Sequence, residues 1–286
     1  MANRSYLYSL GNRPTSYDDR PERISGLSEW AYDVPFIYRL LMSADPQLCA
    51  SLVADGVDGD ESDEGEASSE KGRLYAISSP FAPGLERVRR FADIVKMLVA
   101  TPAAAVAAPV AAPAPAASLM ARLKGMISGA PSDPTPPAAS PAEPPAAVVY
   151  LPGWLDETIA FLEAHRDDFL LLETVELDMM TEGEEEGLRE CVETEIETCR
   201  EVGAAFDALP VDLHEAAQLL ARVAAQEAPP PLDAFFGLRF DDDCDSTRTG
   251  ATDRPLGLTN WSEVLYFGLF NRAEFEADKA RDAASQ

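Results

Sequence analysis

RLYAISSPFAPGLERVRRFADIVKML, residues 73–98, is the stretch that decides the fold. Its first part, Arg73–Ser78, is rich in apolar residues and predicts a β-strand. From Pro83 onward, apolar residues recur every three or four positions, which predicts a helix with one apolar side. The residues on that side are Leu85, Val88, Phe91, Val95 and Leu98. A strand followed by an amphipathic helix indicates an α/β-type element, in which the helix packs on a sheet.

The same two patterns recur along the rest of the chain. Further strands are predicted at Ser5–Leu10, Val148–Leu151, Phe169–Leu177, Phe235–Phe240 and Glu263–Phe270, while Ile24–Trp30 fits either a strand or an irregular lead-in. Helices are predicted from Val34, with Asp33 as the cap, over Pro152–Arg166, over Leu188–Phe206 and after a cap at Asp212. The expected fold is therefore α+β (mixed α/β), with short sheets flanked by amphipathic helices.

Composition divides the chain into three parts. Residues 1–100 form an N-terminal α/β half, which contains a mobile acidic loop at 55–70 with eight acidic residues and no basic ones. Residues 101–147 hold 11 of the 23 prolines and no aromatic residue, which predicts a largely disordered Pro/Ala-rich linker or insertion. Residues 148–286 form a C-terminal α/β half with an acidic helix. The polar tail after Arg272 is expected to fray.

The charge balance limits the classes of partner. The 286 residues include 50 acidic and 23 basic side chains, which give a formal net charge of −27. Such a surface repels nucleic acid and anionic lipid but attracts a basic protein, although solubility alone is an equally good explanation. The sequence has neither a signal-peptide pattern at its start nor an apolar run long enough to span a membrane, so we expect a cytoplasmic protein.

Signatures of catalysis are weak. The chain has two histidines, no G-x-S-x-G elbow, no phosphate-binding glycine loop and no CxxC pair, so we expect neither an enzyme nor a cofactor. Asp241, Asp243 and Asp245 form the one weak metal candidate, because oxygen-rich clusters bind calcium or magnesium. The sequence that follows lacks the glycine and glutamate spacing of an EF-hand, so a solvated acidic loop is the better interpretation.

The acidic helix is the first candidate for contact with a partner. Glu190, Glu193, Glu197 and Glu201 recur three or four residues apart along one helical face. Like charges at this spacing destabilise a helix by a few tenths of a kcal/mol per pair. Such a stripe is explained if a basic surface faces it, and a merely solvated face is the alternative.

Aromatic residues near the N-terminus form the second candidate surface. The cluster, within the first 40 residues, consists of Tyr6, Tyr8, Trp30, Tyr32, Phe36 and Tyr38. Trp30, Tyr32 and the adjoining Asp33 are our candidates for partner contact. Core packing is the alternative, since aromatic residues at strand and helix spacing are more often buried than exposed.

Three stretches carry a family resemblance. Residues 3–9 read NRSYLYS, residues 28–35 read SEWAYDVP, and residues 261–267 read WSEVLYF. In these stretches the chain resembles an uncharacterised bacterial family whose members share N-R-S-Y-L-Y-S and S-E-W-x-Y-D-[VI]-P. The resemblance implies no activity, but it does imply an association with toxin–immunity loci. The acidic loop and the Pro/Ala-rich insertion are particular to this chain.

These observations lead to one functional expectation and two alternatives. The expectation is an immunity- or antitoxin-like protein that binds a basic toxin or effector domain and neutralises it by occlusion. A carboxylate- or metal-dependent enzyme is the first alternative. A DNA-mimic or scaffold protein is the second. The sequence leaves the identity of the partner and the oligomeric state open.

Overall fold

The computed structural model describes residues 3–57, 72–100, 150–225, 255–259 and 261–285. Four of the predicted features lie outside these ranges, wholly or for the most part. They are the acidic loop after residue 57, the insertion at 101–147, the strand at Phe235–Phe240 and the metal candidate at Asp241–Asp245.

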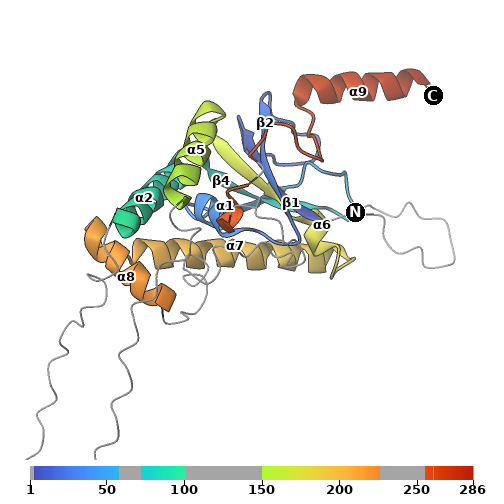
Figure 1. The fold of residues 1–286 in the computed structure, drawn as a ribbon. Helices are drawn as coiled ribbons and strands as arrows, with labels where there is room; N and C mark the ends of the chain where they lie inside the picture. The colour runs from blue at the N-terminus through green and yellow to red at the C-terminus, as the bar shows by residue number, and fades with distance from the viewer. Residues whose placement is uncertain (1–2, 58–71, 101–149, 226–254, 260, 286) are drawn as a thin grey trace, which may run out of the picture.

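One antiparallel sheet organises the molecule (Figure 1). Its five strands are β1 (Arg4–Leu10), β2 (Ile24–Ala31), β3 (Gln47–Ala50), β4 (Tyr75–Pro80) and β5 (Phe169–Glu173). Their order is β2-β1-β5-β4-β3, so β5 pairs with β1 on one side and with β4 on the other. The segments before and after the insertion therefore share one sheet.

Helices cover this sheet, which confirms the α+β prediction. They are α1 (Phe36–Met42), α2 (Phe81–Ala100), α5 (Leu151–Ala164), α6 (Val175–Asp178), α7 (Glu185–Asp207), α8 (Leu213–Ala225) and α9 (Arg272–Ser285), with a 3-10 turn at Pro255–Gly257. In the described ranges, no helix combines the length and the apolar character needed to cross a membrane.

The main core lies between one face of the sheet and the helices α1, α2, α5 and α7. The predicted apolar side of α2 is buried at Leu85, Val88, Phe91 and Val95, and Leu98 is partly buried against the same core. Helices α1 and α2 approach closely at Gly84, where an added Cβ atom would lie 2.1 Å from the carbonyl oxygen of Leu41. A glycine is therefore required where these two helices meet.

A C-terminal strap, residues 261–271, covers the opposite face of the sheet. Leu265, Phe267 and Leu269 pack on a second apolar cluster that includes Tyr6 and Tyr8. The Tyr8 hydroxyl donates a hydrogen bond to the Phe267 carbonyl at 2.7 Å. The strap begins in the main core, where the Trp261 ring contacts the Tyr38 and Phe161 rings, so it wraps around the edge strand β2.

The strand predicted at Glu263–Phe270 is wrong, because this part of the strap forms no hydrogen-bond ladder. The Ser262 amide donates to the Leu27 carbonyl at 2.9 Å, but the Tyr266 amide donates to the Glu29 side chain at 2.6 Å.

Glycine is required opposite the strap as well. An added Cβ atom at Gly26 would lie 2.6 Å from the Glu263 carbonyl oxygen.

Several predicted boundaries are corrected. Leu151 begins α5 instead of ending a strand, the strand from Phe169 stops at Glu173, and β3 had not been predicted. Pro35, not Asp33, is the N-cap of α1, and no side chain caps that helix.

The tail is a helix and does not fray. The Glu274 amide donates to Asn271 Oδ1 at 3.1 Å, and the Asn271 amide donates to Glu274 Oε2 at 3.0 Å. This reciprocal pair is a capping box, which satisfies free amides at a helix start. Phe275 then anchors α9 by packing on Tyr17.

Candidate partner-binding site

The acidic stripe lies on the exposed side of α7. The opposite side of the helix is buried at Leu188, Val192, Ile196, Cys199, Val202 and Phe206, as the helical period predicts. Glu190, Glu193, Glu197 and Glu201 are all exposed. The stripe therefore faces solvent, and its role in partner binding stays a prediction.

Two members of the stripe are neutralised by arginines of the same helix. Arg189 pairs with Glu193 at 2.8 Å, and Arg200 pairs with Glu197. Within the part of the chain that the structure describes, Glu190 and Glu201 form no ion pair. These two carboxylates are the ones left for a basic partner.

A tight turn after β2 carries the second set of candidates. Tyr32 has a φ of +64°, in the left-handed region that favours glycine, and its amide donates to the Asn3 carbonyl at 2.8 Å. The Tyr32 side chain is 47% exposed, whereas that of Trp30 is only 7% exposed and packs in the main core. The structure thus places Tyr32 at the surface and Trp30 in the interior.

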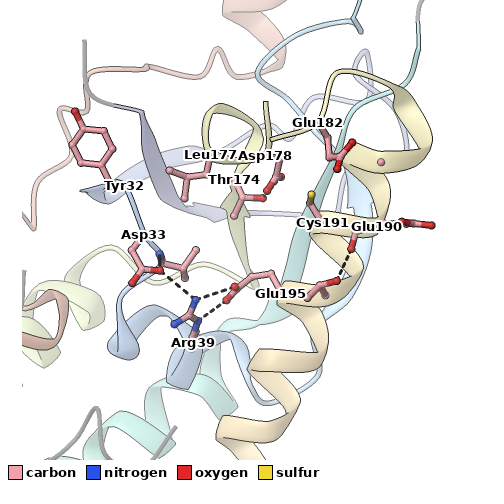
Figure 2. Close-up of a pocket in the computed structure, with 13 residues that line it drawn as sticks. Tyr32, Asp33, Arg39, Thr174, Leu177, Asp178, Glu182, Glu190, Cys191 and Glu195 are labelled. Atoms are coloured by element: carbon pink, nitrogen blue, oxygen red, sulfur yellow. Dashed lines mark hydrogen bonds and ion pairs between the residues drawn. The ribbon is translucent and has the colours of Figure 1, made fainter. Parts of the chain in front are cut away.

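The turn and α7 face each other across a pocket of about 460 Å³ (Figure 2). This volume is within the range of ligand pockets, roughly 300–1,000 Å³. Three of the predicted residues, Tyr32, Asp33 and Glu190, line it together. The remaining lining residues are Val34, Arg39, Thr174, Leu177, Asp178, Glu182, Gly187, Cys191, Thr194 and Glu195.

A partly buried ion pair forms one wall of the pocket. The Arg39 guanidinium donates to both carboxylate oxygens of Glu195, at 2.7 and 3.0 Å, and lies 3.4 Å from Asp33 Oδ1. Burial raises the pKa of Glu195, although Arg39 opposes the shift. Because Arg39 is held by two carboxylates, it adds little free positive charge to the pocket.

Asp178 forms the opposite wall. Burial raises its pKa to about 6, against the hydrogen bond that it accepts from the Thr174 hydroxyl at 2.7 Å, and the charge of Glu195 adds to the rise. In total the pocket has five carboxylates and one guanidinium, a formal charge of −4 when all are ionised. A cation that enters would relieve the repulsion between these carboxylates.

The arrangement does not resemble a metal centre. Among the described residues, no group of three or more His, Cys, Asp or Glu side chains is arranged to hold a metal ion. Asp241, Asp243 and Asp245 lie outside those residues, so the weak metal candidate stays a prediction.

Sequence reasoning missed the other ten lining residues, among them Arg39, Asp178 and Glu195. One signal was present for Glu195, which lies three residues after Val192 and four before Cys199, on the apolar side of α7. A carboxylate in such a position needs a buried partner. Nothing in the sequence identifies that partner as Arg39.

The sequence model of a family described as Domain of unknown function (DUF7822) matches residues 11–118. This range contains the SEWAYDVP stretch at 28–35, but neither NRSYLYS at 3–9 nor WSEVLYF at 261–267. It also omits β1 and β5, the strands that connect β2 to β4 in the sheet. No curated protein and no solved structure matches the chain.

Proposed function

We propose that this chain binds a basic protein through the pocket and the exposed stripe of α7, and neutralises that protein by occlusion. One observation carries the proposal. Tyr32, Asp33 and Glu190, predicted as contact residues from two distant parts of the sequence, line the same acidic pocket.

Electrostatics supports this mode of binding. Concave walls of low dielectric concentrate the field of the charges that line them, which speeds encounter with an oppositely charged partner. The net charge of −27 extends the attraction beyond the pocket. A basic side chain inside the pocket would meet Asp33, Glu182 and Glu190, while Glu201 engages the same partner further along α7.

The biological setting belongs to the proposal as well. The association with toxin–immunity loci that the family resemblance implies is a prediction, and it leads us to propose a basic toxin or effector domain, met in the cytoplasm, as the partner. An inhibitor of this kind needs complementary charge and shape but no catalytic group. The two alternatives, a carboxylate- or metal-dependent enzyme and a DNA mimic or scaffold, remain predictions because no contact among the described residues favours them.

A pull-down at low salt tests the proposal. The full chain is immobilised, exposed to a lysate of the organism that encodes it, and eluted with increasing salt. We expect a basic protein to elute as ionic strength screens the contact. Co-expression of that protein with and without this chain then shows whether its toxicity is relieved.

A matched pair of variants makes the test specific. Glu190→Gln with Glu201→Gln removes two unpaired charges from the proposed surface, and Asp93→Asn with Glu276→Gln removes two exposed charges from α2 and α9. The first variant should lose capture and rescue, whereas the second should keep both. Equal losses in the two variants would show that total charge, not this surface, is responsible.

A further inference from the structure

We infer that His165 and Glu263 form a proton-dependent latch, which fastens the C-terminal strap to the end of α5. His165 Nε2 lies 2.8 Å from Oε1 of Glu263, a residue near the start of the strap. The latch goes beyond the proposed function and does not depend on it. It is carried by the acceptors that surround the imidazole and by the position of this contact in the strap.

Both ring nitrogens of His165 face an oxygen acceptor. Nδ1 lies 2.8 Å from the carbonyl oxygen of Phe161, and Nε2 faces the Glu263 carboxylate. A neutral imidazole has one donor and one acceptor nitrogen, whereas the charged form donates from both. The Glu263 side chain is 62% exposed, and exposed carboxylates are ionised at neutral pH. The two contacts are therefore satisfied together only when the imidazole is charged.

The end of α5 favours a positive charge at this position. His165 is the C-cap of the helix, and its backbone amide also donates to the Phe161 carbonyl, at 3.2 Å. Carbonyl groups at a helix C-terminus attract cations. The Phe161 ring lies against the imidazole, with ring centres 4.1 Å apart. Nδ1 and the ring face are thus held by α5 itself, which leaves Nε2 for the strap.

The charged residues that follow His165 in the chain are engaged elsewhere or exposed. Asp167 pairs with Arg23 at 2.6 Å, and Arg166 and Asp168 are exposed. In the described ranges, Glu263 forms the one ion pair of His165. Loss of the Nε2 proton would turn a lone pair toward the carboxylate, so attraction would become repulsion. Because histidine changes charge between pH 5 and 8, the latch closes at the acidic end of this range and opens at the basic end.

The latch acts where the strap holds the edge of the sheet. One residue before Glu263, the Ser262 amide donates to the Leu27 carbonyl of β2 at 2.9 Å. Two residues after Glu263, Leu265 packs on the second apolar cluster. Opening at Glu263 would therefore loosen the cover of β2 and of the sheet face beneath the strap.

Hydrogen exchange of the full chain tests the latch. Exchange rates of the Ser262 and Tyr266 amides are measured at pH 5.5 and pH 8 and corrected for the intrinsic rate at each pH. Between these values, protection should fall about two- to fivefold more in the parent than in Glu263→Gln, which removes the charge of an exposed side chain. Changes in global stability, such as that from Asp178, are common to both proteins and cancel in the comparison.

The other histidine of the chain, His214, provides the matched control. It is exposed on α8, and its Nε2 lies 2.8 Å from the Gln218 side-chain amide. His214→Gln should leave exchange in the strap as in the parent at both pH values. NMR of the side-chain nitrogens, which separates charged from neutral imidazoles, should show His165 charged at pH 5.5 and neutral at pH 8.

Either of two results would overturn the latch. The first is a His165 imidazole that is already neutral at pH 5.5. The second is a pH dependence of strap exchange that is the same in the parent and in Glu263→Gln. Neither result bears on the basic-partner proposal, whose surface lies on α7 and at the pocket.

Discussion

Glu173 shows how far the fold depends on a single buried carboxyl. Its side chain, at the end of β5, is 0% exposed and accepts hydrogen bonds from the Leu52 amide at 2.7 Å and the Ser51 hydroxyl at 2.8 Å. Burial raises its pKa from 4.5 to about 7, although these two bonds and the charge of Arg20 oppose the rise. Glu173 thus holds the loop after β3 against the sheet at the cost of burying a titratable group.

Stability should therefore fall as pH rises. Because the folded pKa is above the unfolded one, the contribution of Glu173 is complete below about pH 4.5 and is lost as pH rises through about 7. We expect a loss of about 3 kcal/mol between pH 4.5 and 8. In urea titrations at pH 4.5 and pH 8, the free energy of unfolding of Glu173→Gln should therefore fall by about 3 kcal/mol less than that of the parent. Asp178 adds a smaller loss of the same sign, which parent and variant share. Identical pH profiles for the two proteins would contradict the role given to Glu173.

Tyr32 combines backbone strain with exposure, as residues at binding sites often do. Tyr32→Gly should raise the free energy of unfolding by about 1 kcal/mol, because glycine adopts a φ of +64° without a Cβ clash. The same change removes an aromatic side chain that lines the pocket and should weaken capture of the proposed basic partner. A variant that is less stable than the parent in thermal unfolding would show that the turn is not strained.

At the scale of elements, the crossing of α1 and α2 depends on a glycine. Gly84→Ala should lower the free energy of unfolding by about 2 kcal/mol, because its Cβ would lie 2.1 Å from the Leu41 carbonyl oxygen and the helices would have to separate.

Gly153 in α5 provides the matched control for Gly84. It has nothing within 4 Å of an added Cβ, so Gly153→Ala should raise stability by about 0.5–1 kcal/mol. The same substitution in two helices should thus act with opposite signs in denaturant titrations. A stabilising effect at both positions would show that the two helices can move apart without loss.

At the scale of the whole molecule, the three stretches of the family resemblance meet. Residues 3–9 lie in β1, residues 28–31 in β2, and residues 261–267 in the strap that covers both strands. The Tyr8–Phe267 hydrogen bond and the hydrogen bond from the Tyr266 amide to Glu29 join them. These motifs are explained by packing at one edge of the sheet, while Tyr32, Asp33 and Val34 extend to the pocket.

The sheet also predicts how fragments behave. Residues 11–118 contain β2, β3 and β4 but neither β1 nor β5, which separate β2 from β4. Expressed alone, this fragment should be unfolded by circular dichroism and amide NMR, whereas fragments 1–100 and 150–286 should assemble when co-expressed. A cooperative thermal transition in the isolated 11–118 fragment would contradict this expectation.

Sequence patterns predicted the local elements well and the candidate site in part. The 3.6-residue period found α2 and α7, the aromatic run found β1, and the charge pattern put Glu190 on an exposed face. The strap resembles a strand because half-buried and exposed residues alternate along it, with Leu265, Phe267 and Leu269 on the half-buried side. The Asn271–Glu274 capping box was present in the sequence but was not used.

The sequence by itself determined which sides of α2 and α7 are buried, and how much negative charge the chain carries. These properties are local, since a repeat of two or 3.6 residues specifies a buried side without naming what packs there. Only the tertiary structure decided that β5 lies between β1 and β4, that Arg39 pairs with Glu195, and that Tyr32 and Glu190 line one pocket. Each of these depends on strand pairing or packing between residues 89 to 167 positions apart, which periodicity does not encode.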